Sequence, residues 1–184
     1  MAQTPSNMVA LGTAAPDFKL VDVASGNLYH LKGTNTKKAT LIMFICNHCP
    51  YVKHVLDELV RIGKEYIPKG INVIAISSND SSKYPEDGPE QMKALTLEKD
   101  FSFPYLLDEM QEVARAYEAA CTPDFYIYDS DLKLVYRGQL DSSRPKNDIP
   151  VTGKDIRKAL EDILEGRALD NNQVPSIGCN IKWK

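Results

Sequence analysis

Short apolar runs alternate with amphipathic stretches along the chain, and their order predicts its central elements. Residues 40–45 and 71–77 are apolar runs bounded by polar sequence, as expected of strands buried on both faces. Between them, apolar residues recur every three or four positions from 52 to 62, which predicts one buried face of a helix. A strand, a helix and a strand of these lengths indicate a βαβ unit with parallel strands and a right-handed crossover.

The sequence on either side of this unit predicts further elements. Alternation over residues 15–23, turn residues at 25–27 and an apolar segment at 28–31 indicate a β-hairpin. A long polar loop at residues 78–89 follows the unit and can rim a functional site. Apolar spacing then predicts two short helices, at residues 90–99 and 108–117.

The second half of the chain completes the pattern. Three extended segments are expected, at residues 103–107, 125–129 and 132–139, the last two as an antiparallel pair. An amphipathic helix is expected between Thr152, which can cap its N-terminus, and Gly166. Residues 1–12 and 167–184 show no clear period, so we expect them to form an N-terminal arm and a C-terminal tail of a single domain spanning residues 1–184.

Composition limits the possible partners and setting of the protein. With 184 residues, of which 43% are hydrophobic, the chain fits one globular α/β domain. A net charge of -3 and the lack of a Lys/Arg-rich run argue against a nucleic-acid partner. Neither a signal-peptide pattern nor an apolar run of about 18 residues occurs, so we expect a cytoplasmic protein without a membrane partner.

Candidate chemistry lies where the first buried strand meets the helix, in the sequence Cys-Asn-His-Cys-Pro at residues 46–50. Four cysteines are too few for a disulfide scaffold in a chain of this size, which makes the close pair Cys46 and Cys49 catalytic, regulatory or metal-binding. The amides and dipole of a helix N-terminus favour a thiolate over a thiol. The carboxyl end of a central strand is also the usual place for chemistry in such sheets.

This order of elements, with Cys-x-x-Cys at the strand–helix junction and Thr122-Pro123 before a later strand, resembles the thioredoxin fold. Ala-Pro-Asp-Phe at residues 15–18, the strand at 125–129 and the ending at 176–184 resemble a peroxiredoxin-like subgroup related to alkyl hydroperoxide reductase and thiol-specific antioxidant proteins. The resemblance implies a thioredoxin-like α/β fold, in which helices flank a central mixed sheet with an N-terminal β-hairpin.

The thioredoxin pattern assigns roles to the residues of the motif. It implies that Cys46 is an exposed nucleophile and Cys49 a buried resolving thiol. His48 resembles the histidine of disulfide oxidases that stabilises the thiolate, and Asn47 and Pro50 complete the motif. The resemblance also implies a cis-proline, which here is Pro123, with Thr122 and Cys121 beside it. The acid that thioredoxins bury beneath the dithiol is missing, because Thr40 stands at its position.

The peroxiredoxin pattern reverses these roles. It places Cys49, followed by Pro50, at the peroxidatic position, and Cys46 replaces the usual hydroxyl residue. The arginine that peroxiredoxins carry before the later strand is missing, because residues 121–123 read Cys-Thr-Pro. Arg144, in a later loop, is a candidate substitute whose position the sequence does not give.

Other readings of the cysteines stay open. A soft metal site would draw on Cys46, Cys49 and Cys121, completed by His48 or His54, but no second paired motif supports it. Cys121 is a core residue or a third redox thiol with about equal support. A structural role is favoured for Cys179, near the C-terminus, over that of a resolving thiol. We therefore predict neither a metal nor a cofactor.

The leading hypothesis is a thiol–disulfide oxidoreductase in which Cys46 attacks a substrate disulfide and Cys49 resolves the mixed disulfide. The alternative is a thiol peroxidase in which Cys49 becomes a sulfenic acid and Cys46 condenses with it. A third possibility is a metal-binding or redox-sensing protein without turnover. The expected partners are a protein disulfide or a peroxide as substrate and a thiol reductant whose identity the sequence does not give.

Overall fold

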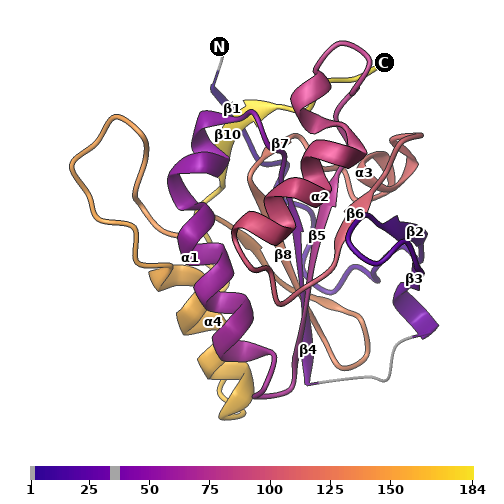
Figure 1. The fold of residues 1–184 in the computed structure, drawn as a ribbon. Helices are drawn as coiled ribbons and strands as arrows, with labels where there is room; N and C mark the ends of the chain where they lie inside the picture. Colours follow the sequence, from indigo (N-terminus) through magenta and orange to yellow (C-terminus); the bar gives the residue numbers. More distant parts are fainter. Residues whose placement is uncertain (1–2, 34–37) are drawn as a thin grey trace.

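A mixed, seven-stranded sheet forms the centre of the computed structural model, which describes residues 3–33 and 38–184 (Figure 1). The strand order is β3-β2-β6-β5-β4-β8-β9, with β4, β5 and β6 parallel and the other pairs antiparallel. The strands are β2 (Lys19–Asp22), β3 (Leu28–His30), β4 (Ala39–Phe44), β5 (Ile71–Ser77), β6 (Tyr105–Leu107), β8 (Asp124–Asp129) and β9 (Leu134–Gly138).

The predicted βαβ unit is present as β4, helix α1 (Pro50–Tyr66) and β5. Every residue of β4 is buried, so neither face of the strand is exposed to solvent. Alternate side chains contribute to two hydrophobic clusters, with Leu41 and Met43 on one side of the sheet and Ile42 and Phe44 on the other. The helix begins at Pro50, where the fixed φ of proline suits a first turn and its missing N–H is not needed.

Helices cover both faces of the sheet. Helices α1, α2 (Pro89–Glu98) and α4 (Lys154–Leu164) pack on one face, and α1 and α4 run side by side in Figure 1. The short helix α3 (Glu112–Ala116) packs on the other face, and two single turns of 3-10 helix are η1 (Leu31–Gly33) and η2 (Pro85–Asp87). No helix in the described ranges has the length and apolar character needed to span a membrane.

A second, three-stranded sheet changes the expected picture of the two ends of the chain. It contains β1 (Gln3–Pro5), β10 (Ile177–Asn180) and β7 (Cys121–Thr122), all antiparallel in the order β1-β10-β7. The predicted arm and tail are therefore partly strands, although residues 1–2 of that arm lie outside the described residues. Strands this short leave too few positions for a period to show in the sequence. Figure 1 shows β1 and β10 beside the start of α1.

Two predicted helix boundaries are wrong because side chains bind the backbone instead. The carboxylate of Asp108 accepts the N–H groups of Val113 and Ala114, so the helix predicted at 108–117 forms only over α3. Thr152 does not cap α4, because Gly153, in the left-handed region at φ 65°, precedes the helix. Asp141 accepts the N–H groups of Thr152 and Gly153 there, at 2.7 Å each.

Candidate active site

Cys46 and Cys49 lie between the end of β4 and the start of α1, both as free thiols hydrogen-bonded to each other. Cys49 is the residue immediately before the helix, with an extended backbone. Residues at this position face the unpaired N–H groups and the positive end of the helix dipole. The arrangement brings the two sulfurs together in a setting that can hold a negative charge.

The Thr122–Pro123 segment faces both thiols. Its peptide bond is cis, as the resemblance implied. The hydroxyl of Thr122 lies 3.4 Å from the sulfur of Cys46, and its carbonyl oxygen accepts the S–H of Cys49 at 3.2 Å. One residue therefore contacts both sulfurs through two different groups.

Both thiols are buried, with 1% of Cys46 and none of Cys49 exposed. The prediction that Cys46 is an exposed nucleophile is therefore wrong for this state of the protein. The small sheet explains the difference, because β10 lies against β7 and contacts α1. Sequence patterns did not predict that β10, near the C-terminus, would lie beside Cys49.

The two thiols differ in acidity. Hydrogen bonding from Cys46 lowers the pKa of Cys49 to about 5, and Cys179 and the amide of Val52 add to the effect. Burial raises the pKa of Cys49, and the carbonyl oxygen of Thr122 favours its protonated form. The hydrogen-bond donors lower the pKa by more than these two effects raise it. The pKa of Cys46 is raised well above its usual value because Cys46 donates to Cys49, is buried and lies near the charge of Asp87. In the reduced pair these shifts favour a negative charge on Cys49 over one on Cys46.

Asp87, in η2, is a residue of the site that the sequence did not identify. Its carboxylate is fully buried and accepts four hydrogen bonds. One oxygen accepts the backbone N–H groups of Asn47 and His48, at 2.8 and 3.1 Å. The other accepts Nδ1 of His48 at 2.5 Å and the side-chain amide of Asn79 at 2.8 Å. The sequence predicted that the loop at 78–89 can rim a functional site, but nothing in the loop distinguishes Asp87 from its other polar residues.

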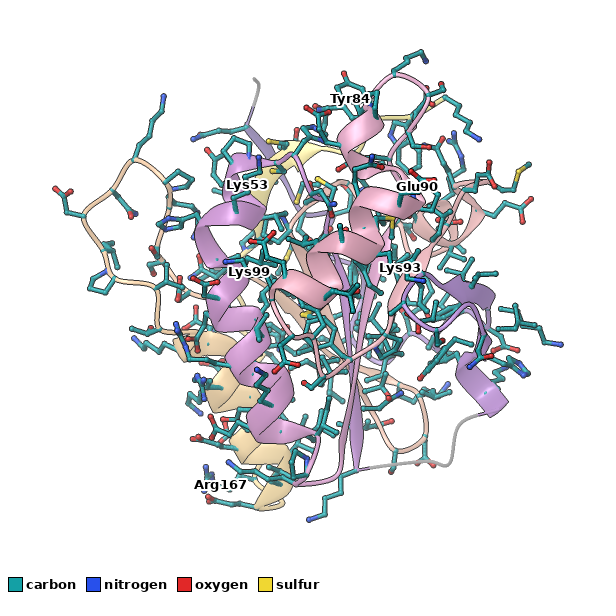
Figure 2. The ribbon with its side chains drawn as sticks, in the orientation of Figure 1. Lys53, Tyr84, Glu90, Lys93, Lys99 and Arg167 are labelled. Atoms are coloured by element: carbon teal, nitrogen blue, oxygen red, sulfur yellow. The ribbon has the colours of Figure 1, made fainter. Side chains whose placement is uncertain are left out.

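His48 and Asn47 are both fixed by neighbours from other elements. The imidazole of His48 stacks on Tyr84 with ring centroids 5.0 Å apart, and its Nε2 is buried with no hydrogen-bond partner among the described residues. Figure 2 shows Tyr84 toward the same end of the molecule as Lys53, near the start of α1. The side-chain oxygen of Asn47 accepts the hydroxyl of Tyr105 at 3.2 Å. Pro50, by contrast, is exposed.

Potential metal ligands converge at one place in the described ranges: Cys46, His48 and Asp87 have ligand atoms within 4.8 Å of one another. Both oxygens of Asp87 already accept two hydrogen bonds each, so a metal ion would have to displace these donors. The alternative ligand His54 instead contacts the hydroxyl of Ser143 at 2.7 Å. The geometry therefore fits a carboxylate–imidazole pair beside a thiol better than a metal centre.

The other two cysteines lie on neighbouring strands of the small sheet. Cys121 is buried in β7 and its thiol lies 3.6 Å from the carbonyl oxygen of Pro123, while burial raises its pKa. Cys179, in β10, is paired with Thr122 and hydrogen-bonded to Cys49. The third thiol that touches the dithiol is thus Cys179, for which the sequence favoured a purely structural role.

Arg144 does not take the place of the missing peroxiredoxin arginine. Its guanidinium donates to the carbonyl oxygens of Asp141 and Ser143, at 2.6 and 2.7 Å, and to the side chain of Gln139 at 2.6 Å. These contacts hold it within its own loop.

Comparison with known proteins places the chain among thiol-active relatives. Residues 11–137 match the AhpC/TSA family. The thiol-disulfide oxidoreductase ResA of Geobacillus kaustophilus (strain HTA426) is 24% identical over 164 residues, which cover 87% of this chain and 82% of that protein. The crystal structure of an uncharacterized conserved protein from Geobacillus kaustophilus is 60% identical with a TM-score of 0.98, covering 100% of this chain and 97% of that one.

A more distant structure identifies the fold. The thioredoxin domain of a thiol-disulfide oxidoreductase from Bacteroides vulgatus is 19% identical with a TM-score of 0.62, covering 83% of this chain and 99% of that one. The fold is therefore thioredoxin-like, with a mixed sheet between helices, as the sequence predicted.

Proposed function

The chain belongs to the AhpC/TSA family and is a thiol-dependent oxidoreductase, and on that premise we propose that Cys46 and Cys49 are the redox pair through which it exchanges disulfides with a substrate. The main support is the contact of both sulfurs with each other and with Thr122, beside a cis-proline. A protein disulfide is the proposed substrate class, and a separate thiol reductant returns the pair to the dithiol.

The proposed exchange begins at Cys49, because a thiolate is the nucleophile and Cys49 is the thiol with the lowered pKa. Its sulfur attacks one sulfur of the substrate disulfide, the substrate S–S bond breaks, and the other substrate sulfur leaves as a thiolate. Cys46 then loses its proton and attacks the sulfur of Cys49, which releases the second substrate sulfur. The substrate gains two electrons, and the enzyme holds a Cys46–Cys49 disulfide.

In this scheme His48 receives the proton of Cys46. A nitrogen of its ring lies within 4.8 Å of the Cys46 sulfur, and Asp87 fixes the ring through Nδ1. Asp87 is a positioning residue, since it acts on the thiols through His48 and through its charge. It supplies a buried carboxylate beside the dithiol, from a different segment of the chain than the position at which Thr40 replaces the acid of thioredoxins.

A thiol peroxidase with Cys49 as the peroxidatic residue is the second candidate. It is supported by the lowered pKa of Cys49 at the start of α1, because a peroxidatic cysteine must be a thiolate. It is less favoured because Arg144, the candidate substitute for the peroxiredoxin arginine, is bound within its own loop. The relative ResA is also a thiol-disulfide oxidoreductase.

Titration of the protein in glutathione redox buffers tests the proposal. We expect loss of two thiols in one step, and a Cys46–Cys49 disulfide in the peptide that contains both residues, with Cys121 still free. Reduction of insulin disulfides by the wild type, and not by Cys49→Ser, would support disulfide exchange. Rapid consumption of hydrogen peroxide without insulin reduction would select the peroxidase. Cys46 and Cys49 remaining free thiols in oxidising buffer, in folded protein, would contradict both.

A further inference from the structure

Cys179 lies against the dithiol in a way that its place in the C-terminal segment did not suggest. Resting on the proposed exchange at Cys49, we propose that Cys179 is a third redox-active thiol, which resolves mixed disulfides on Cys49 as an alternative to Cys46. The structure thus gives Cys49 two resolving partners, one on the active-site loop and one on β10.

The strand pairing places Cys179 at the site. In the antiparallel pair of β10 and β7, Cys179 is directly opposite Thr122, the residue that contacts both sulfurs of the dithiol. Cys179 is 2% exposed and belongs to the same hydrophobic cluster as Cys46 and Cys49. Its thiol is therefore enclosed together with the dithiol.

The glycine before Cys179 permits this close approach. A Cβ atom on Gly178 would lie 2.0 Å from the carbonyl oxygen of Thr122 and 3.1 Å from the nitrogen of Pro123. Since backbone atoms cannot yield as a flexible side chain does, any larger residue would push β10 away from the cis-proline segment. Glycine at this position keeps the strand, and Cys179 on it, against the dithiol.

The chemistry of the contact is that of a resolving thiol. Cys179 and Cys49 are hydrogen-bonded through their side chains, and the contact helps to lower the pKa of Cys49. Burial and the same contact raise the pKa of Cys179 to about 12, so it holds its proton while Cys49 is charged. Cys46 is likewise hydrogen-bonded to Cys49, and its pKa is also raised. The central thiolate is thus flanked by two protonated thiols.

The proposed step balances without an added oxidant. When Cys49 carries a mixed disulfide, the thiol of Cys179 loses its proton, its sulfur attacks the sulfur of Cys49, and the substrate sulfur leaves as a thiolate that takes up the proton. A Cys49–Cys179 disulfide replaces the mixed disulfide. The two thiols have together given two electrons to the substrate, which is now reduced. For the bond to form, the two sulfurs must approach to the S–S bond length of about 2 Å, with Cys179 in line with the bond that breaks. Attack by Cys46 on Cys49 can then return Cys179 to the thiol.

The Cys46→Ser variant isolates this step, with oxidised glutathione as the probe. Reaction at Cys49 releases one reduced glutathione and leaves a glutathione adduct. We expect Cys179 to displace the adduct, so that peptide mapping after acid quenching finds a Cys49–Cys179 disulfide. The double variant Cys46→Ser/Cys179→Ser should retain the adduct on Cys49, at a level at least about tenfold higher than the single variant.

Cys46→Ser/Cys121→Ser is the matched control, because Cys121 is also buried in the small sheet but contacts Pro123 instead of Cys49. It should behave as Cys46→Ser does. Equal amounts of adduct in the single and the Cys179 double variant would overturn the proposal. Should Cys46→Ser fail to fold, Cys46→Ala asks the same question. If the wild-type protein never forms a Cys46–Cys49 disulfide, the proposed function is wrong. If the wild type forms it but Cys46→Ser never forms a Cys49–Cys179 disulfide, only the proposed role of Cys179 is wrong.

Discussion

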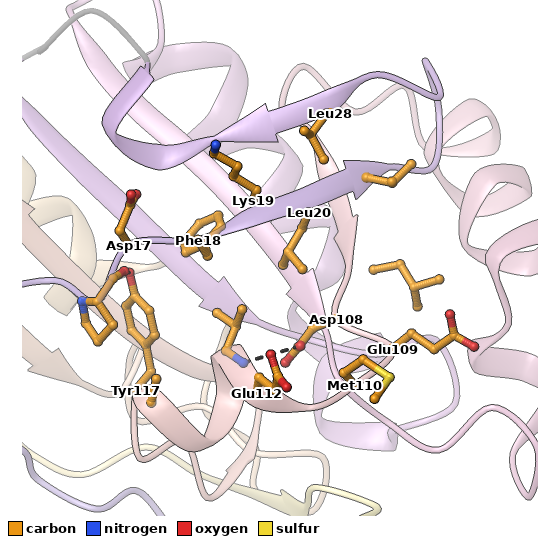
Figure 3. A pocket seen from close by; sticks show the side chains of 15 residues that line it. Asp17, Phe18, Lys19, Leu20, Leu28, Asp108, Glu109, Met110, Glu112 and Tyr117 are labelled. Carbon is orange, nitrogen blue, oxygen red and sulfur yellow. Dashed lines mark hydrogen bonds between the residues drawn. The ribbon is translucent and has the colours of Figure 1, made fainter.

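The dithiol site of Cys46 and Cys49 and a broad cavity of about 660 Å³ differ in size and in chemistry. The cavity lies between the hairpin and α3 (Figure 3). The cavity is lined by residues of β2, by Leu28 and by Met110, and its lining includes neither Cys46 nor Cys49. The dithiol site has little exposed surface, but it brings together two buried thiols, the half-buried imidazole of His48 and the buried carboxylate of Asp87. The proposed reactivity therefore rests on polar groups that converge inside the protein and not on an open cavity.

The largest expected difference between the two regions is in activity. Cys49→Ser removes the thiolate, so we expect disulfide exchange with insulin to fall at least about a thousandfold. Met110→Ser, in the cavity, changes a residue that is 69% exposed and should leave the rate unchanged. Comparable losses in both variants, with both folded, would mean that the cavity takes part in the reaction.

Stability of the reduced protein should depend on pH through Cys49. Its pKa is about 5 in the folded protein and near 8.5 when unfolded, so folding favours the thiolate. The stabilisation is fully present above the unfolded pKa and is lost as the pH falls through about 5. From pH 7.5 to pH 5, the free energy of unfolding should fall by roughly 3 kcal/mol more in reduced wild type than in Cys49→Ser. Urea unfolding measures this difference, and parallel profiles would contradict it.

Asp87→Asn tests whether the buried carboxylate acts on the thiols. Loss of hydrogen bonds to a buried group should lower the free energy of unfolding by about 2 kcal/mol. The pKa of Cys46 should fall as well, because the charge of Asp87 raises it. Glu109→Gln, in the cavity lining, is the matched control and should change neither quantity. An unchanged or higher pKa for Cys46 in folded Asp87→Asn would restrict Asp87 to a structural role.

The smallest effect is expected on the cavity rim. Leu28 is 63% exposed, so Leu28→Ser should change the free energy of unfolding by less than about 0.5 kcal/mol. The rate of disulfide exchange should also stay constant. A clear loss of exchange with protein substrates alone would show that this surface binds them.

Local patterns were sufficient to predict the core of the fold and the position of the dithiol. Strand β5 has the predicted limits, β4 is displaced by one residue, and α1 contains the apolar positions from 52 to 62 that predicted its buried face. These elements could be predicted because burial on one face or on two leaves a recognisable pattern in the sequence. The cis peptide before Pro123 followed from the resemblance.

The remaining features of the site depend on contacts between distant segments. Asp87 reaches Asn47 and His48 across about forty positions of the sequence, from a loop without periodicity. Cys179 reaches Cys49 through a four-residue strand. The contact of Cys46 with Thr122 joins residues 76 positions apart, and no local pattern records such an arrangement.

A carbon-13 NMR titration of the cysteine Cβ atoms in the reduced protein tests most directly where the charge of the dithiol lies. It observes each thiol in the wild type without alkylating it. The proposed site predicts that the Cβ signal of Cys49 titrates near pH 5 while Cys46 stays a thiol through neutral pH. Titration of Cys46 below neutral pH, with Cys49 still protonated, would contradict the assignment of Cys49 as the thiolate and nucleophile.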